Sequence, residues 1–352
     1  MAMHINPEDT RLSWDGAVSF ERGDGWIKPW RIPFEQRALF GETSIDDMML
    51  CRAGMPAGVR IVFRSNTTSL EGEIGEILPN EFNVAETRRA KLDLVCDGAL
   101  LTSFDLGEGT RFHFAGLPRR EKLLELWLPE YRDFRLRSLC LADGATLDRH
   151  ADTRPRWLVY GSSYTQSRGA GSPYYTWPAI AARAYDLNHM NLAYGGQCHL
   201  DSMLARLLRD LPADFLSIEV GVNIQGRATL DARAMRAALI GFVRILRERH
   251  PDVPLAVMSA LYAWERETTR NAAKLTLADT RAIVAEAVEA LRACGDANVH
   301  YFNGLDLIGE VDKELIEDHV HPNVEGYRVL GSRFATQVMG KLLGPAATRA
   351  TP

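Results

Sequence analysis

From about Arg154 onward, short apolar runs alternate with stretches of helical period. This alternation predicts a mainly parallel sheet with helices on both of its faces. The clearest helical stripe carries Met235, Leu239, Phe242 and Leu246, whose spacing buries one face of a helix. We expect five strands and a flavodoxin-like three-layer α/β/α domain, with the strands over 157–160, 189–192, 215–220, 255–259 and 299–302.

The first 150 or so residues have a different rhythm. Short runs of strand length are separated by turn signals such as Cys96-Asp97-Gly98, and helical period is clear only over 45–53. Closely spaced strands of this kind predict a β-sandwich, which we expect to be of jelly-roll type. The expected strands cover 59–63, 92–95, 111–114, 123–127 and 134–136. A proline and charged residues interrupt both rhythms near residue 153, so we expect domains over 1–152 and 153–346.

Composition limits the classes of partner. The net charge is −5 and no basic stripe stands out, which argues against nucleic acid. The five cysteines are scattered and have no zinc spacing, which favours a reducing compartment and predicts no metal site. No apolar stretch reaches membrane-spanning length and no signal peptide is visible, so we expect a cytoplasmic protein without a membrane partner. The composition does not decide whether the chain forms a homo-oligomer.

Residues suited to acyl transfer occur at four separate places. Three of these places each follow a predicted strand: Gly161-Ser162-Ser163, the segment 191–197 and Gly221-Val222-Asn223. The fourth, Asp318 to His321, precedes the terminal helix. Because the carboxyl ends of parallel strands meet at one edge of a sheet, the first three places are expected to face a common crevice.

Each place has a chemical role and a competing structural one. A serine hydroxyl needs a base, for which His321 is the candidate, and Asp318 is spaced to hold the imidazole. Gly196 and Asn223 would supply oxyanion donors. The competing interpretations are that Ser162 and Ser163 cap a helix, that His319 is the functional imidazole, that Gly195-Gly196 is only a tight turn, and that Asn223 caps a helix.

These residues resemble the motif blocks of the SGNH, or GDSL-like, hydrolase superfamily. The first block is similar to segment 160–166, and its Gly-Ser-Ser form is typical of a subgroup with an N-terminal β domain. The resemblance implies that Ser163 is the nucleophile and that its own N–H, Gly196 and Asn223 form the oxyanion hole. Asp318 and His321 fit the last block, and the superfamily uses no metal or organic cofactor.

Two positions depart from the superfamily pattern. Ser162 stands where the best-known form has an Asp, which removes a buried carboxylate from the turn Gly161-Ser162-Ser163, the expected nucleophile turn. Ile224 stands where an Asp often follows the third-block Asn, so the resemblance alone positions Asn223 less firmly.

The resemblance implies a serine esterase in which residues 153–346 form the catalytic domain. We expect it to hydrolyse small acyl esters, above all acetyl esters of a carbohydrate or similar polyol, through an acyl-enzyme on Ser163. Two alternatives remain: acyl transfer to a sugar or metabolite, and a non-catalytic glycan-binding protein on a hydrolase fold. None of these readings requires a cofactor.

Overall fold

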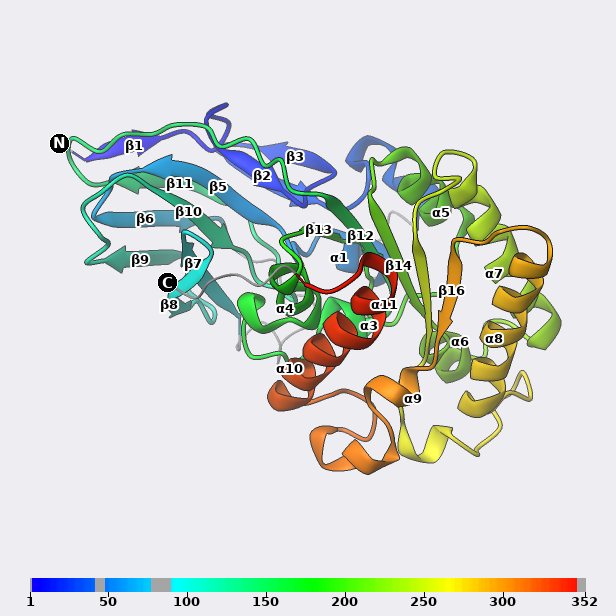
Figure 1. Cartoon of the computed structure of the whole chain (residues 1–352). Coiled ribbons are helices and arrows are strands. Elements are labelled where there is room, and N and C mark those ends of the chain that lie inside the picture. Colours follow the sequence, from blue (N-terminus) through cyan, green and yellow to red (C-terminus); the bar gives the residue numbers. More distant parts are fainter. Residues whose placement is uncertain (1, 42–47, 77–89, 347–352) are drawn as a thin grey trace. The chain divides into compact units, whose positions relative to one another are not determined.

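The chain forms two compact units, shown in a computed structural model that describes residues 2–41, 48–76 and 90–346 (Figure 1). The first unit contains the residues up to Thr153 together with the segment Gly171–Tyr174. The second contains Arg154–Ala170 and continues from Tyr175 to the carboxyl end. The chain therefore leaves the second unit once, for four residues, shortly after Gly161-Ser162-Ser163.

The first unit is built from two antiparallel sheets. One has the strand order β3-β4-β11-β6-β9 with β1 paired to β11, and the other has the order β2-β5-β10-β7-β8. A helix, α1 (Met48–Ala53), and a 3₁₀ turn, Phe34–Leu39, accompany them. The strands are β1 Met3–Ile5, β2 Ser13–Asp15, β3 Ser19–Gly23, β4 Trp26–Trp30, β5 Arg60–Ser65, β6 Ser69–Ile74, β7 Lys91–Cys96, β8 Ala99–Asp105, β9 Arg111–Ala115, β10 Lys122–Trp127 and β11 Leu136–Leu141.

Both sheets contribute to one hydrophobic core. Phe63 and Leu126 of one sheet are buried in the same cluster as Leu70 and Leu139 of the other. The predicted sandwich is therefore confirmed, whereas its jelly-roll connectivity stays a prediction. The strand expected over 134–136 is wrong for its first residues, because β11 begins at Leu136. Of the helix expected over 45–53, residues 45–47 lie outside the described residues.

The segment Gly171–Tyr174 is held in the first unit by a buried carboxylate. Asp93 on β7 accepts hydrogen bonds from the hydroxyl of Ser172 at 2.5 Å and from the backbone N–H of Tyr174 at 2.8 Å. Its other oxygen accepts a bond from the Ser103 hydroxyl at 2.5 Å. These bonds order four residues that the predicted contiguous boundary placed in the second domain.

The second unit contains a five-stranded parallel sheet of order β13-β12-β14-β15-β16, which is the flavodoxin-like order 2-1-3-4-5. All five expected strands are present: β12 Arg156–Tyr160, β13 Asn188–Asn191, β14 Phe215–Val220, β15 Leu255–Ser259 and β16 Val299–Phe302. The central strands β14 and β15 are buried along their whole length, as their largely apolar sequences predict.

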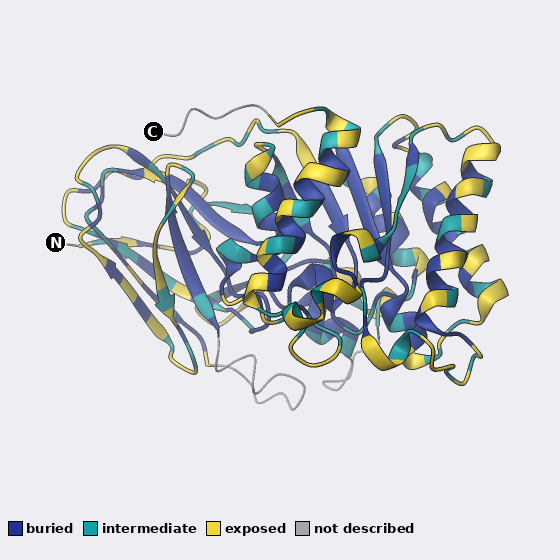
Figure 2. Cartoon of the chain, turned by 60° about the horizontal axis from the view of Figure 1, so that its bottom comes forward, coloured by how far each residue is buried: buried dark blue, intermediate teal, exposed yellow. Residues whose placement is uncertain are grey.

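Helices cover both faces of this sheet, with α7 and α8 on one face and α4 and α10 on the other (Figure 1). The α7 stripe Met235, Leu239, Phe242 and Leu246 is buried as predicted, and Figure 2 shows exposed outer helix faces around buried strands. The helices are α3 Ser163–Gln166, α4 Trp177–Ala184, α5 Ser202–Asp210, α6 Val222–Arg227, α7 Ala232–Arg247, α8 Leu277–Ala293, α9 Gly304–Leu307, α10 Val324–Arg333 and α11 Gly340–Leu343; the π-helical segment Phe334–Met339 joins the last two.

The sheet order places the predicted chemistry at one edge. Ser163 follows β12, the segment 192–197 follows β13, and Asn223 follows β14, so all three leave the carboxyl ends of adjacent parallel strands. Asp318 and His321 lie in the connection between α9 and α10. None of the described helices is long and apolar enough to cross a membrane.

Candidate active site

Ser163, His321 and Asp318 form one hydrogen-bonded chain. Ser163 is the first residue of α3, and its Oγ lies 2.7 Å from His321 Nε2. The other ring nitrogen of His321, Nδ1, lies 2.8 Å from Asp318 Oδ2 and 3.0 Å from Oδ1. The structure thus brings together three residues that are 158 positions apart in sequence at their extremes.

The turn from Asp318 to His321 orients the imidazole and selects its tautomer. Asp318 Oδ1 also accepts the backbone N–H groups of His321 at 2.7 Å and Val320 at 3.2 Å. Burial opposes the charge of Asp318, but the hydrogen bonds from His321 and the backbone outweigh it and lower the pKa of this carboxyl. A charged carboxylate can only accept, so Nδ1 carries the proton and Nε2 is left to accept the proton of Ser163.

The neighbouring histidine has a different environment. The ring of His319 packs against Trp264, with the centroids 4.6 Å apart, and its φ of 64° turns the backbone into the left-handed region. His321 is therefore the imidazole that contacts both Asp318 and the serine, and His319 is not.

The two serines of the nucleophile turn have separate contacts. Ser162 Oγ accepts the backbone N–H of Tyr164 at 3.2 Å, so the helix-cap interpretation is correct for Ser162. The Ser163 hydroxyl instead faces His321. Only Ser163 is thus placed to transfer its proton to the imidazole.

The loop that contains Gly196 is tied to the nucleophile turn. Tyr194 donates its backbone N–H to the carbonyl of Gly161 at 2.9 Å, and Gly195 donates its N–H to Gln166 Oε1 on α3 at 2.8 Å. Gly196 has a φ of 77°, which favours glycine. Gly195-Gly196 therefore does form a tight turn, and among the described residues no acceptor takes the N–H of Gly196 in that turn.

His199 holds the peptide of Gly196 from the carbonyl side. Its Nε2 lies 3.2 Å from the Gly196 carbonyl and its Nδ1 lies 3.0 Å from Thr229 Oγ1. Since a carbonyl can only accept, Nε2 carries the proton and Nδ1 accepts the threonine hydroxyl. Burial lowers the pKa of His199, which favours this neutral form. This contact could not be predicted from residue types, because the imidazole of His199 bonds to a backbone carbonyl.

Asn223 is oriented by a third loop contact. Its Oδ1 accepts the backbone N–H of Cys198 at 3.0 Å, so its Nδ2 donors lie on the opposite side of the amide. The helix-cap interpretation of Asn223 is wrong, because Gly221 occupies the cap position of α6 and Asn223 is already inside the helix. Within the described residues, no protein acceptor takes the N–H of Ser163, the N–H of Gly196 or Nδ2 of Asn223.

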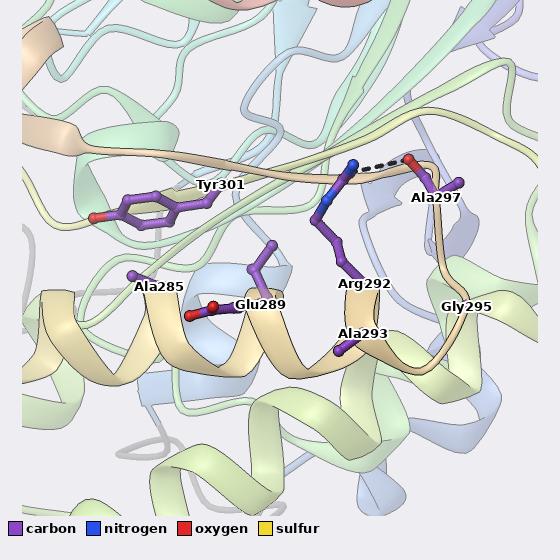
Figure 3. Close-up of a pocket in the computed structure, with 8 residues that line it drawn as sticks. Ala285, Glu289, Arg292, Ala293, Gly295, Ala297 and Tyr301 are labelled. Carbon is purple, nitrogen blue, oxygen red and sulfur yellow. Dashed lines mark hydrogen bonds between the residues drawn. The ribbon is translucent and has the colours of Figure 1, made fainter.

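A surface hollow elsewhere on the second unit has a structural explanation. It lies along α8 and the edge strand β16, and Figure 3 shows Arg292 reaching back across the turn between them. Arg292 Nη1 donates to the carbonyls of Ala297 at 3.0 Å and Val299 at 2.7 Å, which closes this turn. The lining contains none of the predicted site residues: Ala285, Val288, Glu289, Arg292, Ala293, Gly295, Ala297 and Tyr301. Among residues 2–41, 48–76 and 90–346, no cluster of three or more His, Cys, Asp or Glu side chains could hold a metal ion.

Two family models match this chain. Residues 155–339 match the model of the GDSL-like lipase/acylhydrolase family, a span of more than half of the chain. The chain belongs to the GDSL-like lipase/acylhydrolase family. Residues 12–137 match a second model, the SsfX3 N-terminal domain. The predicted membership of the SGNH or GDSL-like superfamily, with an added N-terminal domain, is thereby confirmed.

Solved structures share this fold. A salicylyl-acyltransferase, SsfX3, from a tetracycline biosynthetic pathway is 34% identical, with a TM-score of 0.86 and coverage of 98% of this chain and 99% of that one. A protein from Bacteroides ovatus described as a GDSL-like lipase is 21% identical, with a TM-score of 0.77 and coverage of 97% and 98%. An acetyl xylan esterase from Butyrivibrio proteoclasticus is 13% identical, with a TM-score of 0.60 and coverage of 98% and 99%. No curated protein gives a significant sequence match.

Proposed function

We propose that this GDSL-like family member is a serine esterase that hydrolyses small acyl esters through an acyl-enzyme on Ser163. The observation that carries the proposal is the continuous hydrogen-bonded chain from Ser163 Oγ through His321 to Asp318. A hydroxyl becomes an effective nucleophile when an adjacent imidazole removes its proton during attack, and this chain supplies that imidazole already oriented.

The first half-reaction follows from the positions of these groups. Ser163 Oγ attacks the ester carbonyl carbon while His321 Nε2 takes the hydroxyl proton, and Asp318 stabilises the imidazolium that forms. The carbonyl oxygen becomes an oxyanion, for which the N–H groups of Ser163 and Gly196 and Nδ2 of Asn223 are the donors. The tetrahedral intermediate then expels the alcohol, and His321 returns the proton to it.

The second half-reaction repeats the same proton transfers with water. His321 Nε2 removes a proton from a water molecule, whose oxygen attacks the acyl carbon of the Ser163 ester. Collapse of this second oxyanion breaks the bond to Ser163 Oγ, which recovers its proton from His321. The products are a carboxylic acid and a free enzyme, so neither redox change nor cofactor enters the balance.

For the substrate, we propose an acetyl ester of a carbohydrate or similar polyol. One structure with the same fold is named as an acetyl xylan esterase, which supports testing sugar acetates first. At 13% identity the similarity to that protein shows a shared fold and not a shared substrate. Screening acetylated sugars against longer acyl esters measures this part of the proposal separately from the chemistry.

Turnover of a short-chain aryl acetate tests the chemistry. We expect Ser163→Ala and His321→Ala each to lower kcat by at least about 10³-fold, with folding little changed. His319→Ala is the matched control, because His319 lies two residues from His321 and packs against Trp264 instead of the serine. Wild-type turnover in Ser163→Ala would overturn the proposal.

A second candidate function is acyl transfer to an acceptor other than water. The observation that favours it is the 34% identity, across 98% of this chain, to a structure named as a salicylyl-acyltransferase. The same Ser163 acyl-enzyme serves both reactions, and only the second nucleophile differs. Product analysis in the presence of competing alcohols distinguishes them: an acyltransferase forms the new ester in preference to the free acid.

A further inference from the structure

A buried carboxylate on β14 contacts the nucleophile turn. Glu219 is 1% exposed, and a single oxygen of its carboxylate, Oε2, accepts every one of its three side-chain hydrogen bonds. The donors are the backbone N–H of Ser162 at 2.9 Å, the hydroxyl of Ser162 at 2.6 Å and the hydroxyl of Thr165 at 3.3 Å. Two of the three donors therefore belong to the residue that directly precedes Ser163.

The buried environment of Glu219 disfavours the charged form of its carboxyl group. Within the described part of the chain, Oε1 has no hydrogen-bond partner and no ion pair to Glu219 is formed. Burial raises the pKa of Glu219, and the bonds from Ser162 and Thr165 oppose this rise. A buried carboxyl group with one unpaired oxygen is destabilising on its own, so its place in the fold calls for an explanation other than stability.

The backbone of the turn is shaped to admit this carboxylate. A Cβ at Gly161 would lie 2.9 Å from Glu219 Oε2 and 2.3 Å from Thr165 Oγ1, so any larger residue would push apart the acceptor and one of its donors. Gly161 therefore allows the carboxylate to reach the N–H of Ser162 directly.

We propose that Glu219 is a positioning residue that holds the nucleophile turn in its reactive geometry. The inference rests on the proposed function of Ser163. Ser162 Oγ donates to Glu219 Oε2 and at the same time accepts the N–H of Tyr164, so it links β14 to the first turn of α3. Ser163 lies between Ser162 and Tyr164, and its backbone direction is thus fixed on both sides by one anchored hydroxyl.

This geometry assigns the effect to an acceptor oxygen and not to a negative charge. All the contacts end on Oε2, and a glutamine amide oxygen in the same position can accept the same bonds. A negative charge beside an oxyanion site would moreover oppose the charge that develops during attack. The conservative variant Glu219→Gln is therefore expected to keep what Glu219→Ala loses.

Steady-state kinetics with an aryl acetate test the inference, using Glu219→Ala, Glu219→Gln and Ser162→Ala. We expect Glu219→Ala to lower kcat by about 100-fold while KM stays within about threefold, because misplacing a reacting atom acts on the chemical step. Ser162→Ala keeps the backbone bond but loses the hydroxyl link, so we expect a loss of about tenfold. Glu219→Gln is expected to stay within about fivefold of the wild type.

Labelling with a fluorophosphonate gives a second readout that depends on the nucleophile alone. The rate of labelling should follow the same order as kcat, with Glu219→Gln fastest, Ser162→Ala slower and Glu219→Ala slowest. Thermal unfolding of each variant shows the folded fraction. If Glu219→Ala does not fold, Ser162→Ala decides, since it leaves the carboxylate in place. A wild-type kcat in the folded Ser162→Ala or Glu219→Ala protein overturns the inference, as does Glu219→Gln falling as low as Glu219→Ala.

Ser163→Ala separates this inference from the proposed function. If Ser163→Ala keeps its activity, the proposed chemistry fails whatever the Glu219 variants show. If Ser163→Ala is inactive while Glu219→Ala turns over normally, the esterase proposal stands and only the positioning role is lost.

Discussion

Replacing Asp318 by asparagine should lower kcat more than replacing it by alanine. In the wild type, Oδ1 of Asp318 accepts two backbone N–H groups, from His321 at 2.7 Å and from Val320 at 3.2 Å. An asparagine keeps these bonds only if its carbonyl oxygen takes the position of Oδ1. Its amide nitrogen then takes the position of Oδ2, which is 2.8 Å from His321 Nδ1.

That orientation favours the wrong imidazole tautomer. An amide nitrogen can only donate, so at 2.8 Å it favours an Nδ1 that accepts, with the proton on Nε2, over the longer contact of Nδ1–H with the carbonyl oxygen at 3.0 Å. A protonated Nε2 faces Ser163 Oγ at 2.7 Å and cannot accept the serine proton. From the effect of this tautomer in Ser-His-Asp sites, we expect Asp318→Asn to lower kcat by about 10⁴-fold.

Asp318→Ala lacks the misplaced donor. The Asp318 side chain is 43% exposed, so water can solvate Nδ1–H of His321 and the productive tautomer remains accessible. We expect a loss of about 10²- to 10³-fold, which corresponds to a poorly oriented but competent base. The ion pair of Asp318 with Arg168, at 3.5 Å and half-exposed on both sides, contributes little to the difference.

Initial rates on an aryl acetate at neutral pH give the comparison, with thermal unfolding as the control for folding. We expect Asp318→Ala to be at least about tenfold faster than Asp318→Asn. Equal rates, or a faster Asp318→Asn enzyme, would refute the assignment of the backbone bonds as the cause of the orientation.

Two further predictions test the oxyanion site and the pH dependence of stability. Asn223→Asp keeps the bond to the Cys198 N–H but removes the Nδ2 donor, so kcat should fall by at least about 10²-fold, measured against Asn223→Ala as the variant that loses both. Burial raises the pKa of Glu130 to about 8, and the nearby Asp93 charge adds to this, so the folded state keeps a proton that the unfolded chain releases above its ordinary pKa of 4.5. This contribution to stability is complete below pH 4.5 and is lost as the pH rises toward 8, with a slope of up to about 1.4 kcal/mol per pH unit. Urea unfolding between pH 5 and 8, about the window of this titration, measures the free energy of unfolding against pH, which should change less with pH for Glu130→Gln than for the wild type. The same pH dependence in both proteins would contradict the raised pKa of Glu130.

The parallel sheet could be predicted closely because its strands are buried on both faces. Largely apolar runs such as 215–220 and 255–259 mark such strands, and β14 and β15 have those bounds in the structure. The strands of the β-sandwich were harder to predict. Strands such as β1 and β2 have three residues each, and β8 is largely exposed, so the pattern of side chains gives little indication of them.

The site shows the same division between local and distant information. Ser163, Gly196 and Asn223 follow predicted strands, so residue type and strand position together indicated them. The buried carboxylate that contacts Ser162 could not be predicted, because Glu219 is 57 residues away and stands inside an otherwise apolar strand. The sequence lacks the superfamily's Asp at position 162, and the structure places a carboxylate against that position from another strand.

Mapping the covalent adduct of a fluorophosphonate tests the central claim most directly. After labelling of the wild-type protein, peptide mass spectrometry should find the adduct on Ser163 and not on Ser162, since only the Ser163 hydroxyl faces His321. His321→Ala should label far more slowly, and His319→Ala at the normal rate. An adduct on another residue, or no adduct on the folded wild-type protein, would contradict the assignment of Ser163 as the nucleophile.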